Sequence, residues 1–374
     1  MKYYLIAGEA SGDLHGSNLM KGLKAEDPGA EFRFWGGAMM EAVGGTKVRD
    51  YRDTAVMGLV DVLGSLGKIA KNLRDCKKDI LSWRPNVVIL IDYPGFNMKI
   101  ARFCHEEGIR NFYYIAPKTW ASRESRNRRL KAWVDRLFIV FPFEIPYFTE
   151  KGIPFIYKGN PLVDAVDSHS YKRAVVGRSI AILPGSRKSE ISHTMPNAMA
   201  MADSLHSLPQ YADCQFVVAG APARSQADYA PYVKDRPYVK VVFGRTYDIL
   251  KYADAAMVNS GTASLEAALI GTPQVVCWST QTITAVLAKY VLRVLDHIKY
   301  ISLGNLILDR LAFRELIQFD FTPEAVTSEM RRLVEDLPYR EKMLDDYKEI
   351  RHRLGGSGSS VEVAKAMIAE LLAR

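Results

Sequence analysis

Short apolar runs, separated by longer stretches with helical periodicity, dominate the pattern of hydrophobic and polar positions along the chain. The runs are continuously apolar instead of alternating, which is typical of parallel strands that helices cover on both faces. They predict strands at 2–8, 31–36, 87–92, 111–116, 137–141 and 154–158, then at 179–183, 215–219, 239–243, 255–259 and 274–278. Helices are expected between them, at 16–26, 98–107, 125–135, 195–207, 247–253 and 262–270.

This alternation of strands and helices restarts near residue 178, after the polar stretch DAVDSHSYKRAVVG. A chain of 374 residues has the length of two domains, and strand–helix alternation implies doubly wound sheets. We therefore predict an α/β protein with two Rossmann-like domains, over 1–165 and 178–339. The tail from about 340 to 374 is helical in pattern and breaks at GGSGSS, and its last helix at 361–373 has an apolar stripe that needs a partner.

Composition and charge indicate an anionic binding partner but do not distinguish between several classes of it. Hydrophobic residues make up 48% of the chain and charged residues 25%, as in ordinary globular proteins with sizeable cores. The net charge of +8 favours nucleic acid, an anionic membrane surface or phosphorylated substrates. The four cysteines and seven histidines form neither a CxxC pair nor an HExxH cluster, so we expect reduced thiols and no metal site. No apolar stretch reaches the roughly 18 residues of a membrane span.

The turn in ILPGSRKSEI, residues 182–191, is the first candidate site. A strand ends there, Pro184, Gly185 and Ser186 make a turn, and Arg187 leads towards a helix. Backbone N–H groups at such a turn, backed by a guanidinium, suit a diphosphate. The alternative is a plain strand-to-helix turn with a solvated arginine.

The stretch NSGTASLEAALIGTP strengthens the case for a phosphate ligand. The small residues Ser260, Gly261 and Thr262 let a ligand approach the backbone. A helix begins at Thr262 or Ala263, and its positive end faces the turn. Glu266 lies one turn further on, where it can accept hydrogen bonds from two ribose hydroxyls or simply compensate the helix dipole. Both turns end strands of one sheet, so together they indicate a nucleoside-diphosphate site.

A third turn, in LIAGEASGD, contains two acids that would repel a phosphate, Glu9 and Asp13. No acidic residue follows the next strand, as dinucleotide binding would require. Carboxylates suit the hydroxyl groups of a sugar better, so Ser11, Gly12 and Asp13 are candidate acceptor-binding residues. Asp92, in VVILIDYPGFN, ends another strand of this sheet and is either a capping or loop residue or a general base.

Two further stretches are candidates for contact with lipid. The helical pattern at 55–73 fits a core-facing helix or an apolar patch at a membrane, whose residues would be Val60, Val62, Leu63, Leu66 and Ile69. Within the stretch at 122–136, residues 123–131 include five basic side chains beside an apolar face, namely Arg123, Arg126, Arg128, Arg129 and Lys131. They form either a solvated basic face or one attracted to anionic headgroups, at about 1 kcal/mol per basic residue near the surface.

Seven stretches, taken together and in order, resemble the lipid-A-disaccharide synthase family. They are AGEASGD (7–13), AVMGLVDVL (55–63), IDYPGFN (91–97), PFE (142–144), LPGSR..EI (183–191), SGTASLE (260–266) and SLGNLI (302–307). The resemblance covers nearly the whole chain. It implies a GT-B fold, in which two Rossmann-like domains face a cleft and the C-terminal segment crosses back to the first domain. The Gly/Ser connection before the last helix also permits its exchange between two chains, and hence a homodimer.

The resemblance also implies a reaction. The family joins UDP-2,3-diacylglucosamine to 2,3-diacylglucosamine 1-phosphate by an inverting transfer that forms a β-1,6 disaccharide and releases UDP. It needs neither metal nor cofactor and works peripherally on the cytoplasmic face of the inner membrane, with no nucleic acid partner. Mapped by motif, the base is Asp92, the acidic turn residue is Glu9 and the diphosphate contact is Arg187. The residues on the uridine side are Ser260, Thr262, Glu266 and Asn305.

Two alternatives stay open from the residues. One is a different GT-B enzyme, such as another UDP-N-acetylglucosamine transferase or an epimerase. The other is a non-catalytic basic protein that binds nucleic acid or a lipid surface, for which the basic stretch at 123–131 is the main support. Release of UDP on addition of both acylated sugars would separate the enzyme from the binding protein.

Overall fold

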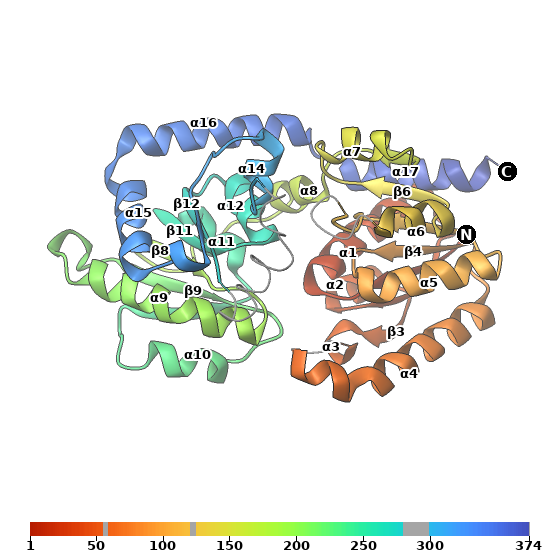
Figure 1. Cartoon of the computed structure of the whole chain (residues 1–374), viewed down its shortest axis with the longest axis horizontal. Coiled ribbons are helices and arrows are strands. Elements are labelled where there is room, and N and C mark those ends of the chain that lie inside the picture. The colour runs from red at the N-terminus through yellow and green to blue at the C-terminus, as the bar shows by residue number, and fades with distance from the viewer. Residues whose placement is uncertain (55–58, 120–124, 280–298, 374) are drawn as a thin grey trace. The chain divides into compact units, whose positions relative to one another are not determined.

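The chain forms two compact units, each built on its own parallel sheet (Figure 1). The computed structural model describes residues 1–54, 59–119, 125–279 and 299–373, with the backbone alone for 54, 59–66 and 125. The first unit comprises Met1–Asp167 and Leu354–Arg374, and the second comprises Ser168–Arg353. The sequence assigned the chain from about 340 to the first domain, but most of α16 (Leu337–Leu354) lies in the second unit.

The first sheet has seven parallel strands in the order β3-β2-β1-β4-β5-β6-β7 among the described residues. Every strand except the edge strands has two neighbours, which explains the continuously apolar runs of the central ones. The strands are β1 (Lys2–Ala7), β2 (Glu31–Gly36), β3 (Thr46–Asp50), β4 (Val87–Ile91), β5 (Asn111–Tyr114), β6 (Arg136–Ile139) and β7 (Phe155–Tyr157).

Helices cover both faces of this sheet (Figure 1). One face carries α1 (Ala10–Glu26), α2 (Ala38–Val43), α8 (Pro161–Asp167) and α17 (Ser359–Leu372). The other carries α4 (Leu59–Trp83), α5 (Pro94–Glu106) and α6 (Ser125–Trp133). On that second face, Tyr4 and Val88 of the sheet pack with Cys76 of α4 and Ile100 of α5. The short helices α3 (Tyr51–Thr54) and α7 (Glu144–Glu150) complete the unit.

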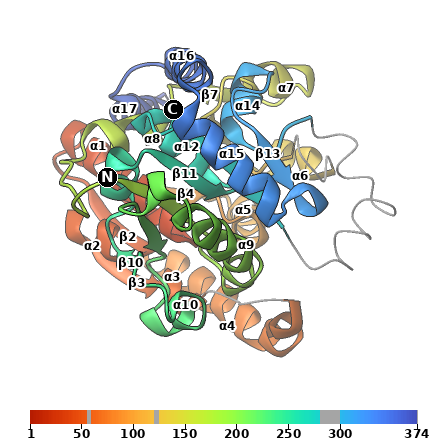
Figure 2. The same ribbon diagram turned by 90° about the vertical axis from the view of Figure 1, so that its left-hand side faces the viewer.

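The second unit repeats the plan with six parallel strands in the order β10-β9-β8-β11-β12-β13 among the described residues. The strands are β8 (Ser179–Leu183), β9 (Gln215–Gly220), β10 (Val239–Phe243), β11 (Ala255–Asn259), β12 (Gln274–Trp278) and β13 (Glu315–Ile317). Its helices are α9 (Lys188–His206), α10 (Gln226–Val233), α11 (Thr246–Tyr252), α12 (Thr262–Ile270), α14 (Leu303–Leu308), α15 (Pro323–Glu335) and α16. α9 and α15 lie side by side on one face, as Figures 1 and 2 both show.

Two strands and several helix starts differ from the sequence-based expectation. β3, with the sequence TKVRD, and β13, with the sequence ELI, are edge strands whose polar residues gave no apolar run. α1 begins at Ala10 and not at residue 16, because its small and polar first turns have no apolar period. For the same reason α9 begins at Lys188 and not at 195.

The last helix packs on the first unit, which confirms the expected crossing back of the C-terminal segment. α17 lies against α1 at Gly22, where a Cβ would come 2.9 Å from the carbonyl oxygen of Ser360 and 3.1 Å from the Cβ of Ala364. The carboxylate of Asp164, in α8, accepts hydrogen bonds from the backbone N–H groups of Gly358 and Ser360 at the start of α17. The helix is therefore fixed along its side and at its N-terminus.

No helix in the described parts of the chain is long and apolar enough to cross a membrane.

Gly22→Ala and Gly67→Ala form a matched pair of helix-interior substitutions. A Cβ on Gly67 would meet no described atom within 4 Å, whereas on Gly22 it would crowd the backbone of Ser360. Alanine favours a helix over glycine by about 1 kcal/mol, so Gly67→Ala should raise the free energy of unfolding. Gly22→Ala should lower it by about 1–3 kcal/mol, because α17 must move away from α1. Chemical denaturation compares the two, and equal effects would contradict this packing.

Candidate functional site

The order of the strands reverses at one point in each sheet. In the first sheet the chain moves from β1 to β2 and β3, then returns to β4 on the other side of β1. In the second sheet the reversal falls between β8 and β11. Doubly wound proteins bind ligands in the crevice at such a point, outside the carboxyl ends of the strands. The four candidate turns found in the sequence follow these same four strands, two in each unit.

Glu9 and Asp92 leave the first sheet from neighbouring positions, because Ala7 of β1 pairs with Ile91 of β4. Glu9 is exposed and Asp92 is partly exposed. A Cβ on Gly8 would come within 2.2 Å of the ring of Tyr93. The glycine of this turn therefore makes room for an aromatic ring from the β4 turn, and no phosphate is needed to explain it.

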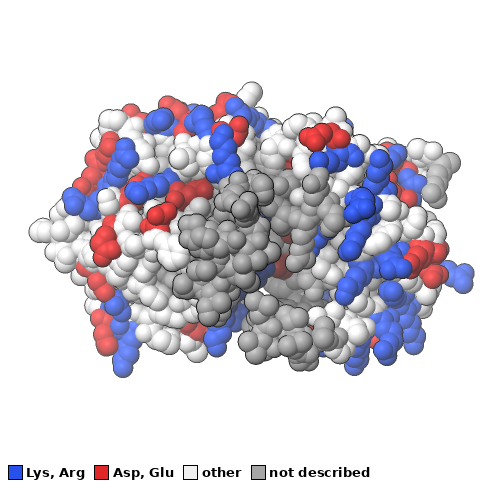
Figure 3. All heavy atoms as spheres, viewed as in Figure 1, with Lys and Arg blue, Asp and Glu red and all other residues white. Residues whose placement is uncertain are grey.

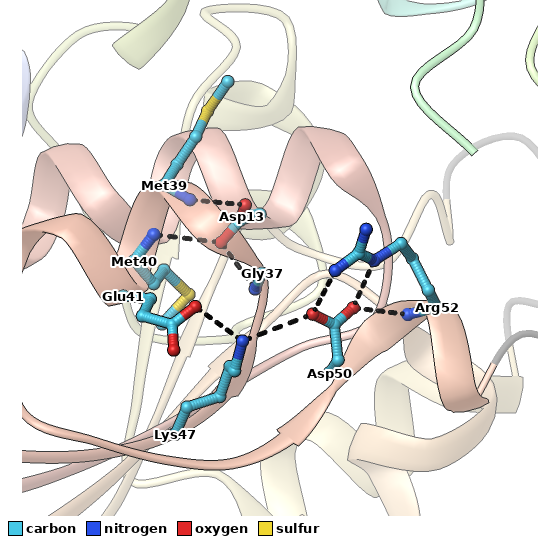
Figure 4. A network of polar contacts seen from close by, with 8 residues as sticks. All are labelled: Asp13, Gly37, Met39, Met40, Glu41, Lys47, Asp50 and Arg52. Carbon is cyan, nitrogen blue, oxygen red and sulfur yellow. Dashed lines mark hydrogen bonds and ion pairs between the residues drawn. The ribbon is translucent and has the colours of Figure 1, made fainter. Parts of the chain in front are cut away.

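Asp13, predicted to bind acceptor hydroxyls, turns its carboxylate towards a neighbouring helix (Figure 4). Its Oδ1 accepts from the backbone N–H groups of Gly37 at 2.7 Å and Met40 at 3.1 Å, and its Oδ2 accepts from Met39 at 3.1 Å. These donors lie at the start of α2, where a carboxylate neutralises the positive end of the helix. The side chain is 4% exposed, so this geometry gives Asp13 a structural role in place of the predicted one.

Ser11 and Gly12, the other candidate acceptor residues, lie in the first turn of α1 and not in an open turn. Ser11 is partly exposed. Gly12 is buried, and a Cβ there would lie 3.1 Å from the Cβ of Ala7. Gly12 therefore serves the close packing of α1 on β1, while contact of Ser11 with a sugar stays a prediction.

A set of ion pairs fixes the end of β3 close to Asp13 (Figure 4). Lys47 lies 2.6 Å from Glu41 of α2 and 3.5 Å from Asp50. Arg52 donates to both oxygens of Asp50 at 2.8 Å, and these bonds lower the pKa of Asp50 to about 2. The carboxylate is thus charged at neutral pH and ties β3 to α3.

In the second unit, the PGSR turn is closed by an acid of its own helix. Glu190 Oε2 accepts from the backbone N–H groups of Ser186 at 2.8 Å and Arg187 at 3.1 Å. These are the donors that the sequence analysis offered to a diphosphate, so in this structure a carboxylate already occupies them. Gly185 has φ of +104°, and a Cβ there would lie 2.9 Å from Asn259 Nδ2, which shows that the β8 and β11 turns meet. The side chain of Arg187 is exposed, and its Nη1 lies 3.3 Å from Glu190 Oε1.

The second turn of this pair begins α12. Ser260 donates its backbone N–H to the carbonyl of Cys277 at 2.8 Å. Thr262 and Ala263 are partly exposed in the first turn of α12. Gly261 occupies the cap position, and the first turn contains no acidic residue. No acidic side chain of the first turn therefore offsets the positive end of this helix.

Glu266 is held by a residue that the sequence analysis did not single out. Tyr247, in α11, donates its hydroxyl to Glu266 Oε1 at 2.9 Å. Burial raises the pKa of Glu266. The edge of the Tyr247 ring also meets His169, with the ring centroids 5.2 Å apart. The bond orients the carboxylate and engages one of its two oxygens.

Asn305, assigned to the uridine side by the resemblance, is fully buried in α14. Its Oδ1 accepts from the N–H of Ala312 at 2.8 Å and of Phe313 at 3.3 Å. Its Nδ2 donates to the carbonyl of Phe313 at 2.9 Å and to Glu315 at 2.8 Å. Both ends of the amide are engaged within the protein, so the geometry gives Asn305 a structural role in place of direct contact with a nucleotide.

Glu315 connects Asn305 to the nucleotide turn. Besides the amide of Asn305, its carboxylate accepts from the N–H of Ile301 at 2.9 Å and from the N–H and hydroxyl of Ser302. The carbonyl of Ile301 in turn accepts from the hydroxyl of Ser260 at 3.3 Å. A chain of hydrogen bonds thus links Asn305 through Glu315 to the turn at Ser260. No local sequence motif marks Glu315.

The predicted membrane patch falls largely outside what the structure describes. The side chains of Val60, Val62, Leu63 and Leu66 are outside the described residues, as is Arg123, whereas Ile69 is partly exposed on α4. Basic side chains gather over α4, α5 and α6 in Figure 3. We call this surface the basic face and define it by Lys68, Lys71, Arg74, Lys78, Lys99, Arg102, Arg128, Arg129 and Lys131, all exposed.

Aromatic residues hold part of the basic face together. Arg102 of α5 and Arg129 of α6 lie 5.8 and 5.9 Å from the ring centroid of Trp133. Lys77 of α4 lies 4.9 Å from the ring centroid of Phe103 in α5.

Among the described residues, no group of three or more His, Cys, Asp or Glu is placed to hold a metal ion.

Solved structures that match the chain share this plan of two parallel-sheet domains. They include a UDP-GlcNAc 2-epimerase from Neisseria meningitidis bound to UDP-GlcNAc (TM-score 0.69, 12% identity, 99% of this chain and 100% of that one). Another is S. aureus MnaA with UDP (TM-score 0.73, 12% identity, 100% of this chain and 98% of that one). A third is the glycosyltransferase of kitacinnamycin (TM-score 0.65, 16% identity, 99% of this chain and 99% of that one). At these identities the likeness shows the fold alone, which is the GT-B fold of glycosyltransferases and related epimerases.

Sequence comparison is more specific. The family model for lipid-A-disaccharide synthetase matches residues 3–368. The lipid-A-disaccharide synthase of Geobacter metallireducens is 36% identical over 379 residues, covering 99% of this chain and 97% of that protein. The lipid-A-disaccharide synthase of Trichlorobacter lovleyi is 34% identical over 371 residues, covering 96% of this chain and 95% of that protein. The chain therefore belongs to the lipid-A-disaccharide synthetase family and is a glycosyltransferase of lipid A synthesis.

Proposed function

We propose that the protein transfers the sugar of UDP-2,3-diacylglucosamine to 2,3-diacylglucosamine 1-phosphate with inversion, forming a β-1,6 disaccharide and releasing UDP. One observation carries the proposal: the two switch points hold different chemistry. Carboxylates follow β1 and β4, whereas an exposed arginine and an acid-free helix N-terminus follow β8 and β11. A carboxylate can serve as a base for a sugar acceptor, whereas an arginine and the positive end of a helix suit a diphosphate.

The second unit is proposed to bind the UDP part of the donor without metal. Arg187 and the N-terminus of α12 would neutralise the diphosphate. Glu266, oriented by Tyr247, would accept a hydrogen bond from a ribose hydroxyl. Ser260 and Thr262 are small and leave the nucleotide room beside the backbone.

The first unit is proposed to bind the acceptor and supply the base. Inversion is a single displacement, so one base suffices and no covalent intermediate forms. Asp92 takes the proton of the acceptor 6-hydroxyl as that oxygen attacks the anomeric carbon, and the bond from this carbon to the diphosphate breaks. Glu9 orients the sugar hydroxyls from the neighbouring strand end.

Arg187→Ala should weaken UDP binding by about 1.5–3 kcal/mol, the contribution of a charged hydrogen bond. Arg332→Ala is the matched control, because both arginines are exposed and paired with an acid on their own helix. Calorimetry with UDP in the presence of EDTA measures both. Unchanged affinity in Arg187→Ala, or binding that requires Mg²⁺, would refute this nucleotide site.

Asp92→Asn keeps the shape of the side chain and removes its basicity. UDP release in the presence of both acylated sugars should fall by about 10²–10⁴-fold, the usual contribution of a general base. UDP affinity should stay near that of the wild type. If Asp92→Asn retains its turnover and Glu9→Gln does not, Glu9 is the base. Wild-type protein that epimerises UDP-N-acetylglucosamine and transfers no sugar would refute the proposed reaction itself.

Both acylated substrates reside in a bilayer, so we propose that the basic face rests on anionic lipid at the cytoplasmic side of the inner membrane, as a peripheral contact. Replacing Arg128 and Arg129 with glutamate should reduce binding to anionic vesicles at least tenfold, since each basic residue near the surface contributes about 1 kcal/mol. The control replaces the exposed Lys234 and Lys240 of the second unit with glutamate, which changes the net charge by the same amount. Equal losses in both pairs would show a charge effect that is not specific to this face.

A further inference from the structure

The backbone at Asp92 and Tyr93 has a conformation that few side chains adopt. Both residues are left-handed, with φ of 45° at Asp92 and φ of 50° and ψ of 52° at Tyr93. Glycine is the usual residue for such positions, because a Cβ crowds the backbone there. Tyr93 also precedes Pro94, where the chain is ordinarily extended. Strain of this kind persists only where the surroundings enforce it, and it concentrates at functional sites.

Two buried side chains hold the carbonyl of Asp92. The hydroxyl of Tyr113, in β5, donates to this oxygen at 2.7 Å, and Asn97 Nδ2, in α5, donates to it at 2.8 Å. Asn97 Nδ2 also lies 3.2 Å from the carbonyl of Ile91 and 3.3 Å from that of Ile6. All its partners are acceptors, which fixes the orientation of the amide. One amide thus ties the ends of β1 and β4 together at the switch point.

The ring of Tyr93 holds the turn from the other side. It stacks on Phe96 with the ring centroids 5.5 Å apart, and it lies directly against Gly8. The peptide after Asp92 is therefore fixed at its carbonyl by hydrogen bonds and at its next side chain by packing. Relaxation of Asp92 to an ordinary conformation would break both.

We propose that Tyr113 and Asn97 are positioning residues for the base, an inference that rests on the proposed role of Asp92. Neither can touch substrate, because both side chains are fully buried. They hold Asp92 in the left-handed conformation and so set the direction in which its carboxylate leaves β4. Proton abstraction depends steeply on that direction, since a misplacement of about 1 Å can cost about 10²-fold in rate.

Tyr113→Phe removes one hydroxyl and little else. Turnover with both acylated sugars should fall about tenfold, a fraction of the cost of a full misplacement, while the KM for the UDP-sugar and the Kd of UDP stay unchanged. Tyr347→Phe is the matched control, because Tyr347 is also buried and donates its hydroxyl to a backbone carbonyl, that of Thr272 at 3.1 Å. Both variants should lose similar thermal stability, but Tyr347→Phe should keep its turnover. A loss of Tm without a loss of kcat in Tyr113→Phe would overturn the proposal.

The double variant of Asp92→Asn with Tyr113→Phe tests whether Tyr113 acts through Asp92. If it does, adding Tyr113→Phe to Asp92→Asn should cost no further turnover, because coupled residues are not additive. The same tenfold loss in both backgrounds would overturn the positioning role and leave the base assignment intact. Full turnover in Asp92→Asn alone would instead overturn the base assignment.

Asn97→Ser provides a second variant if Tyr113→Phe fails to fold. The shorter side chain removes the amide from the carbonyl of Asp92 but keeps a buried polar group. As for Tyr113→Phe, we expect a lower kcat and an unchanged affinity for UDP. Both are measured at a temperature at which circular dichroism shows that the variant is folded. Wild-type kcat in folded Asn97→Ser would overturn its positioning role.

Discussion

The order in which parallel strands are joined is the constraint on which both candidate sites depend. Crossovers between parallel strands are right-handed, so the helices that follow β1 and β4 lie on opposite faces of their sheet. The same holds for the helices after β8 and β11. The chain therefore diverges at one point in each sheet, which is where doubly wound proteins bind their ligands. Topology supplies the two places, and the residues at the turns decide their chemistry.

Carboxylates of the chain itself occupy several helix N-termini. Asp13 accepts from the start of α2, Asp164 from the start of α17 and Glu190 from the start of α9. Each would compete with a ligand anion for the same N–H groups. The start of α12 differs, since Gly261 caps it and no acid lies in its first turn. Among these four helices, only α12 begins without a carboxylate of the described chain at its first N–H groups.

The sequence predicted the central strands and the four turns because their signals are local. Runs such as VVILI are continuously apolar where a strand is buried on both faces, whereas the polar edge strand β3 leaves no such run. Glycines and acids at strand ends likewise mark turns without further information. The partners of those acids could not be predicted in the same way, because they come from elsewhere in the chain. Tyr113 lies 21 residues from Asp92 and meets it only because β5 pairs with β4.

The residues that complete the first unit are synthesised only after the whole of the second unit. While the ribosome makes the second unit, α1 has no α17 to cover Gly22 and its neighbours, although its own sheet can already form. The second unit is contiguous from Ser168 to Arg353 and can close its core before α17 is synthesised. The two units are therefore finished in the reverse of their order along the chain. A nascent chain stalled before Ser359 would expose the uncovered side of α1 to chaperones and proteases.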